Sequence, residues 1–193
     1  GIAIGLRSKV EGTLNTKDGN VNEQGTVALG TDSHAKGNGA AAFGWKAKGI
    51  GEGAMAFGTN TEAKESGTAF GGNANAAAGA VAMGWQANAH DVWAMSIGTS
   101  SDAKGKFSTA LGGATTAEAV GSTAVGFKAV SKEVLSTAVG AQSVAEESGS
   151  VALGADSVAN TKAGEIGYIA TGGSATFEDA LKTLNKKEDY DKW

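Results

Sequence analysis

The chain has no cysteine and no proline, and aromatic residues make up only 6% of its 193 residues. Without cysteine it forms no disulfide and offers no thiolate for catalysis or metal binding. With so few aromatic side chains it has little bulk to fill a wide globular core. It also lacks any run of eighteen apolar residues and any recognisable signal peptide, so we expect no membrane-spanning helix. If the protein is exported, we expect this chain to be an interior part of a longer one.

An excess of charge of either sign is also missing. Sixteen lysine and arginine residues face twenty aspartate and glutamate residues, which gives a net charge of −4 at pH 7. The chain therefore has neither the excess of basic residues that is typical of a nucleic-acid-binding protein nor the high net charge of a disordered chain. We therefore expect a folded protein with no nucleic-acid partner.

Glycine, in contrast, is abundant, and much of it recurs in one motif: alanine, a large apolar residue, glycine. The motif repeats at steps of 13 or 14 residues, with "AIG" at 3–5 as an outlying copy and "GEIG" at 164–167 as a degenerate one. A fixed short period of this kind is typical of a solenoid. We expect these glycines to form corners: Gly30, Gly44, Gly58, Gly71, Gly84, Gly98, Gly112, Gly126, Gly140 and Gly154.

The residues around each motif glycine alternate with a period of two, which indicates short strands. One strand ends at the glycine, and a second follows it, with small residues on one face and polar residues on the other. A second glycine column, five places before the motif glycine, supplies another corner. The large apolar residues of the first strand are Leu29, Phe43, Phe57, Phe70, Met83, Ile97, Leu111, Val125, Val139 and Leu153.

Two strands and two corners in about 14 residues make one coil of a two-sided solenoid. The sequence thus predicts an all-β parallel roll of eleven or twelve coils, roughly 50 Å long at about 4.8 Å per coil. We expect the large apolar side chains to fill a narrow lumen against alanine or serine. The opposite assignment, with these side chains facing neighbouring chains, remains open.

Two nine-residue stretches carry a family resemblance: "GTVALGTDS" at 25–33 and "GSVALGADS" at 149–157. They resemble the SVAIGxxS signature of YadA-like heads in trimeric autotransporter adhesins, with leucine in place of isoleucine. The resemblance implies a left-handed parallel β-roll, a homotrimer and display on the extracellular face of the bacterial outer membrane. It also implies a membrane anchor in a distant C-terminal segment outside this chain.

The resemblance further implies adhesion to host extracellular matrix, such as collagen, fibronectin or laminin, or to host cell surfaces. The alternative is a structural spacer in an adhesin fibre with no ligand of its own. We expect no enzyme, cofactor or metal site. His34 and His90 should lie about 20 Å apart, four coils from one another, which is too far to share a metal ion.

The alanine at the middle of each first strand gives a second reason to expect self-association. If the large residues face the lumen, these alanines form an apolar stripe on the outer surface. We would expect another copy of the chain to cover this stripe. The aromatic residues are the other candidates for contact. They could fill grooves between the chains of a trimer, form an exposed ligand-binding ladder, or fill crevices within one chain: Trp45, Trp85, Trp93, Phe107 and Phe127.

Three regions follow from this reading. Residues 1–24 form an irregular first coil or an N-terminal cap, with a turn at 18–20. Residues 25–172 form the roll. Residues 173–193 form a short helical segment that starts at Thr176 and leads to a neck or stalk or caps the roll. The neck motif of the family is absent from this last region.

Overall fold

The strands of this fold are only two or three residues long. In each repeat only a few consecutive residues point their side chains alternately inward and outward. The computed structural model describes residues 1–11, 13–14, 21–22 and 25–162. This part contains two parallel sheets and a small hairpin, and no helix. The predicted all-β parallel solenoid with coils of 13 or 14 residues is confirmed.

Each coil gives one strand to each of two 11-stranded sheets. Sheet A contains β1 (Ile2–Ile4), β5 (Val27–Leu29), β7 (Ala41–Phe43), β9 (Met55–Phe57), β11 (Thr68–Phe70), β13 (Val81–Met83), β15 (Met95–Ile97), β17 (Thr109–Leu111), β19 (Thr123–Val125), β21 (Thr137–Val139) and β23 (Val151–Leu153). Sheet B contains β2 (Lys9–Glu11), β6 (His34–Lys36), β8 (Lys48–Ile50), β10 (Glu62–Ala63), β12 (Asn75–Ala76), β14 (Asn88–Ala89), β16 (Asp102–Ala103), β18 (Thr116–Ala117), β20 (Val130–Ser131), β22 (Val144–Ala145) and β24 (Val158–Ala159).

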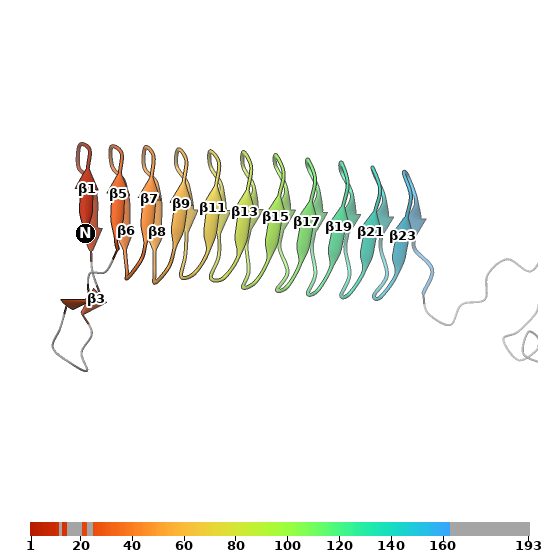
Figure 1. The fold of residues 1–193 in the computed structure, drawn as a ribbon. Coiled ribbons are helices and arrows are strands. Elements are labelled where there is room, and N and C mark those ends of the chain that lie inside the picture. Colours follow the sequence, from red (N-terminus) through yellow and green to blue (C-terminus); the bar gives the residue numbers. More distant parts are fainter. Residues whose placement is uncertain (12, 15–20, 23–24, 163–193) are drawn as a thin grey trace, which may run out of the picture. The chain divides into compact units, whose positions relative to one another are not determined.

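Successive coils lie side by side in chain order, as Figure 1 shows. Equivalent residues pair in register, so that Ala42 lies opposite Ala28 on one side and Ala56 on the other. The backbone hydrogen bonds of the strands therefore run from coil to coil. Each coil is hydrogen-bonded to the coils beside it. The stability of the stack is therefore approximately the sum of the free energies of similar coil–coil interfaces.

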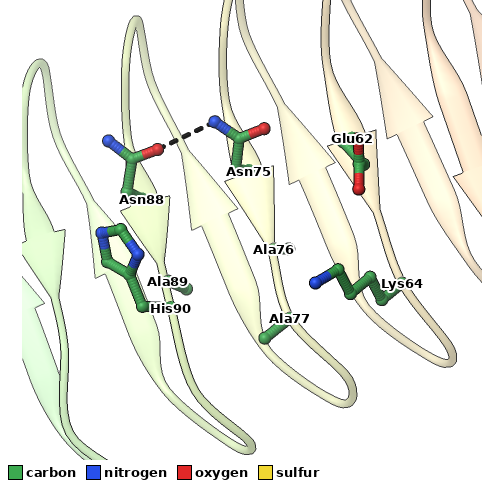
Figure 2. A pocket seen from close by; sticks show the side chains of 8 residues that line it. All are labelled: Glu62, Lys64, Asn75, Ala76, Ala77, Asn88, Ala89 and His90. Carbon is green, nitrogen blue, oxygen red and sulfur yellow. Dashed lines mark hydrogen bonds between the residues drawn. The ribbon is translucent and has the colours of Figure 1, made fainter.

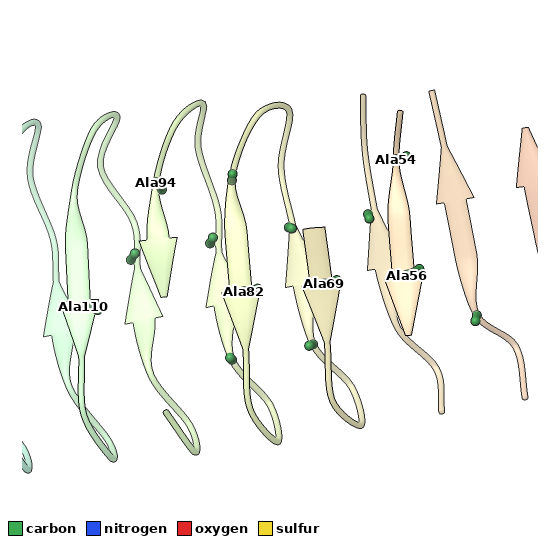
Figure 3. Packing of buried hydrophobic residues seen from close by; sticks show 14 of the residues in the cluster. Ala54, Ala56, Ala69, Ala82, Ala94 and Ala110 are labelled. Atoms are coloured by element: carbon green, nitrogen blue, oxygen red, sulfur yellow. The ribbon is translucent and has the colours of Figure 1, made fainter. Parts of the chain in front are cut away.

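The space between the two sheets is filled by small side chains. Glycine aside, every buried residue of the described part is alanine, serine or threonine. Figure 3 shows Ala56, Ala69 and Ala82 succeeding one another from coil to coil in this space. A Cβ on the buried Gly49 of sheet B would lie only 2.5 Å from the carbonyl oxygen of Ala41 in sheet A. The sheets approach too closely for larger side chains.

Our expectation that the large apolar residues fill this lumen is therefore wrong. They lie on the outer face of sheet A and are half-buried or exposed: Leu29, Phe43, Phe57, Phe70, Met83, Ile97, Leu111, Val125, Val139 and Leu153. Because side chains alternate along a strand, the central alanines point inward instead. The expected outward alanine stripe is wrong for the same reason, since its members are buried: Ala28, Ala56, Ala82, Ala110, Ala124, Ala138 and Ala152.

The first corner of each coil, from sheet A to sheet B, begins at a motif glycine. These glycines have φ between 114° and 139°, a backbone conformation that residues other than glycine rarely adopt. Most of them also face the next coil closely: a Cβ on Gly44 would lie 2.3 Å from the carbonyl oxygen of Gly58. The ten corner glycines are Gly30, Gly44, Gly58, Gly71, Gly84, Gly98, Gly112, Gly126, Gly140 and Gly154.

Inward serine and threonine hydroxyls hold the corners. At the first corner Ser33 Oγ donates to the carbonyl oxygen of Gly30 at 2.8 Å, and Ser157 Oγ donates to that of Gly154 at 2.8 Å. At the second corner, which leads from sheet B to the next coil, Ser122 Oγ donates to the carbonyl oxygen of Ala119 at 2.7 Å. Each of these carbonyls also accepts the backbone N–H of the same serine, so the hydroxyl adds a second hydrogen bond to the turn.

The first coil belongs to both sheets, since Ile2 pairs with Val27 and Lys9 pairs with His34. The longer interval before Gly30 contains the antiparallel hairpin of β3 (Thr13–Leu14) and β4 (Val21–Asn22). The compact unit of coils spans Gly1–Asn160. The expected turn at 18–20, the expected boundary at 172 and the expected helical segment at 173–193 lie outside the described residues.

Candidate binding surfaces

The outer face of sheet A is a continuous apolar surface. Its strands present two outward columns, and every outward residue in them is apolar or threonine. Phenylalanine rings stack along one column: the centroids of Phe43 and Phe57 lie 4.7 Å apart with an interplanar angle of 8°, and those of Phe57 and Phe70 lie 6.2 Å apart. An exposed apolar face of this extent is typical of an interface.

Three of the predicted contact aromatics lie at the first corner, one place after the motif glycine. Trp45, Trp85 and Phe127 follow β7, β13 and β19, so they recur every third coil, about 14 Å apart. Their side chains are 49–57% exposed. A Cβ on Gly72 would lie 2.4 Å from Cζ3 of Trp85, so the indole packs closely against the preceding coil.

The other two predicted aromatics lie at the second corner. Trp93 and Phe107 have φ of 60° and 57°, in the left-handed region where equivalent positions hold Gly79 and Gly121. This conformation costs a bulky residue about 1–2 kcal/mol. Both side chains are more than 60% exposed, and Leu135 repeats the arrangement two coils later. The five aromatics thus form two separate rows at opposite corners.

The outer face of sheet B is polar over most coils and carries ion pairs, although its last three strands present valine at one outward position. His90 Nε2 lies 2.7 Å from Asp102 Oδ1, and Lys132 Nζ donates to Glu146 Oε1 at 2.6 Å. The hydrogen bond to Glu146 raises the pKa of Lys132. His34 and His90 belong to coils of β6 and β14, four coils apart as expected. The described residues contain no group of three potential metal ligands.

Near its middle, sheet B carries two adjoining hollows. The first, of about 260 Å³, is lined among others by Glu62, Lys64, Asn75, Ala77, Asn88 and His90. Figure 2 shows the short side chain of Ala77 between the longer ones of Lys64 and His90. The second, of about 430 Å³, is lined by Asn73, Asn75, Gln86, Asn88, Ser100 and Asp102. Asn75 and Asn88 line both hollows.

Comparison with known protein families matches the YadA head domain repeat at residues 23–47, 94–114, 103–129 and 134–157. These stretches contain complete coils with the motif glycine at its corner and the alanine in the lumen. The chain carries YadA head repeats. The comparison with curated proteins found no match. No helix of the described residues is long and apolar enough to cross a membrane.

The structure gives a role to the main residues of the nine-residue stretch that resembles the YadA head signature. In the copy at 149–157, Ala152 faces the lumen, Val151 and Leu153 face outward, and Gly154 begins the corner that Ser157 ties. The matched YadA head repeats leave residues 48–93 uncovered. The two 13-residue coils, from Gly58 to Gly84, fall in this interval.

Sequence reasoning did not find the two hollows. They lie across the two short coils and the coils that follow them, mostly in the unmatched interval 48–93, while Ser100 and Asp102 lie in the matched stretch 94–114. One signal was visible in the sequence: asparagine recurs at a spacing of 13, at Asn60 and Asn73 and again at Asn75 and Asn88. Both pairs are hydrogen-bonded side chain to side chain at 2.9 Å.

Proposed function

We propose that this chain is the head of a bacterial surface adhesin, displayed on the extracellular face of the outer membrane as a left-handed homotrimeric roll. The YadA head repeats support the adhesin type. The observation that carries the proposal is the outer face of sheet A, where apolar residues and threonine follow one another along the whole stack. Its natural occupants are two further copies of the same chain.

Burial of this face in a trimer assigns roles to the two sheets. Apolar side chains such as Phe57 and Phe70 would leave water, which is favourable by about 25 cal/mol per Å². Sheet B, with its paired charges, would remain outside and face the host. This arrangement leaves the corner rows, Trp45 and Trp85 on one side and Trp93 and Phe107 on the other, at the borders between chains or beside the exposed face.

The partners we propose are host extracellular matrix proteins, namely collagen, fibronectin or laminin, or the host cell surface. The proposal is tested in two steps. Light scattering coupled to size exclusion should give three times 19.0 kDa for the purified chain. A stable 19.0 kDa species would overturn the trimer.

The second step measures binding of the purified chain to immobilised collagen, fibronectin and laminin and to cultured host cells, with albumin-coated surfaces as the control. Saturable binding to one of them supports the adhesin head. A trimer that binds none of them overturns the head function and supports a structural spacer.

A further inference from the structure

Near its middle, the outer face of sheet B carries polar side chains that the fold of the repeat does not require. At the same outward position other coils of sheet B have lysine, histidine, glutamate, aspartate, threonine or valine, as at Lys48, Thr116 and Val130. Coils β12 and β14 place Asn75 and Asn88 there instead. Their side chains are the shared wall of the two hollows (Figure 2).

The two amides are held in one orientation. Asn75 Nδ2 donates to Asn88 Oδ1 at 2.9 Å and to the carbonyl oxygen of Asn73 at 3.2 Å. Asn88 Nδ2 donates to the carbonyl oxygen of Gln86 at 3.1 Å. These bonds use both amide hydrogens of Asn75 and one of Asn88. Asn75 Oδ1 remains as an acceptor and one Asn88 N–H as a donor, and Figure 2 shows these two groups at opposite ends of the hydrogen-bonded pair.

The hollow beside these amides is open because Ala77 is small. The same outward column holds Lys64 one coil before and His90 one coil after, so the alanine leaves a gap between two long side chains. Charges of both signs surround the hollows, since Glu62 and Asp102 are acidic and Lys64 is basic. Glu62 lies 3.9 Å from Lys48, and Asp102 lies 2.7 Å from Nε2 of His90. A polar, nearly neutral ligand suits this environment better than a strongly charged one.

An aromatic surface borders the polar row. Trp85 directly precedes Gln86, and its indole lies over Gly72, which directly precedes Asn73. Both Gln86 and Asn73 line the second hollow. The indole is 53% exposed. An exposed, fixed indole presents a flat apolar face beside hydrogen-bonding groups.

From this juxtaposition we propose that the two hollows form a binding groove for a neutral oligosaccharide. Sugar hydroxyls both donate and accept hydrogen bonds, which matches the free acceptor of Asn75 and the free donor of Asn88. The C–H face of a sugar ring packs on an indole, which Trp85 supplies at the edge of the groove. The inference deepens the proposed function and rests on it in one respect, because sheet B must face outward in the assembled head.

The experiment is binding of the assembled chain to an array of immobilised oligosaccharides of defined sequence, followed by saturation-transfer NMR with the free sugar that binds best. Three variants test the groove: Asn88→Val removes an amide, Ala77→Gln fills the hollow, and Trp85→Thr removes the indole. Ala77 and Asn88 are half-buried and Trp85 is exposed. Valine and threonine already occur at the equivalent places of other coils, at Val130 and Thr99. We expect each to weaken sugar binding about tenfold, the loss of about 1.4 kcal/mol.

Matched controls lie in the same columns on other coils. Thr116→Val removes a polar group from the outward column of Asn88, and Trp45→Thr removes the indole three coils before Trp85. Both should bind the sugar as the unmodified chain does. Absence of any saccharide binding at millimolar concentration overturns the groove, and so does binding that the three variants leave unchanged.

The outcomes also separate this inference from the proposed function. A chain that binds matrix protein but no sugar retains the adhesin function and loses the groove. If Asn88→Val abolishes binding to a matrix protein instead, the hollows bind protein and the saccharide assignment is wrong. If the chain binds neither a matrix protein nor a sugar, the adhesin function and the groove are both overturned.

Discussion

A Cβ placed on Gly140 would lie 2.3 Å from the carbonyl oxygen of Gly154 in the next coil. No atom lies within 4 Å of the equivalent position on Gly149, at the second corner of the same coil. The two glycine columns therefore differ in what they require. The first column is glycine in every described coil, whereas the second also accepts Trp93, Phe107 and Leu135 in the left-handed conformation.

Gly140→Ala should destabilise the roll more than Gly149→Ala. At φ 136° the first substitution costs about 1–3 kcal/mol of backbone strain before the contact with Gly154 is counted. At φ 67° the second costs about 1–2 kcal/mol. Thermal unfolding of the two variants measures the difference. Equal melting temperatures would show that the close approach of the corners has no energetic consequence.

Ala110→Leu should disrupt the stack. Ala110 is fully buried between sheets that leave no room for a larger side chain, so the cost should exceed the about 1–3 kcal/mol that is typical of overpacking. Thr109→Val, on the outer face of the same strand, is the control and should change stability by less than about 0.5 kcal/mol. Unchanged unfolding of Ala110→Leu would contradict the placement of this column in the lumen.

Phe57→Asp should abolish self-association of the chain. The substitution puts a charge into the middle of the Phe43–Phe57–Phe70 stack on sheet A, where burial in a trimer would leave it unpaired. Light scattering should show loss of the three-chain mass. Val130→Asp places the same charge on sheet B and should leave the mass unchanged. If both variants behave alike, sheet A is not the interface.

Glu11→Gln should remove stability at neutral pH but not in acid. The hydrogen bond from Lys9, with the charges of Lys9, His34 and Lys36, lowers the pKa of Glu11 below its ordinary value of 4.5. A lowered pKa in the folded state means stability that is present above 4.5 and is lost as the pH falls through the lower, folded value. Unfolding of the Gln variant and the unmodified chain should therefore differ at neutral pH and converge well below pH 4.5. A constant difference across this range would exclude the ionised carboxylate as its source.

The period of the sequence was sufficient to predict the coils, their parallel pairing and their corner glycines. It was not sufficient to say which face of the first strand points inward. Alternation such as Thr109, Ala110, Leu111 is compatible with either assignment. What decides between them is the distance between the sheets, which the corners set and which a single strand does not reveal.

The hollows were missed for a related reason. They depend on three coils that meet in space, through the shared wall of Asn75 and Asn88 and the gap at Ala77. Each residue alone is an ordinary outward residue of its strand. The same holds at the second corner. Trp93 stands five places before Gly98, where other coils have glycine, and only the backbone shows that it keeps the glycine conformation.

The in-register coils also bear on how such a gene can change. Because each coil pairs only with its neighbours and begins and ends at the same place in the pattern, duplication or loss of one 14-residue unit leaves every remaining contact in register. The near-identical stretches at 25–33 and 149–157 each cover the same part of such a unit. Recombination between them would shorten or lengthen the protein by whole coils, about 4.8 Å each. Lineages could thus tune how far this protein extends while keeping a fold that needs no other adjustment.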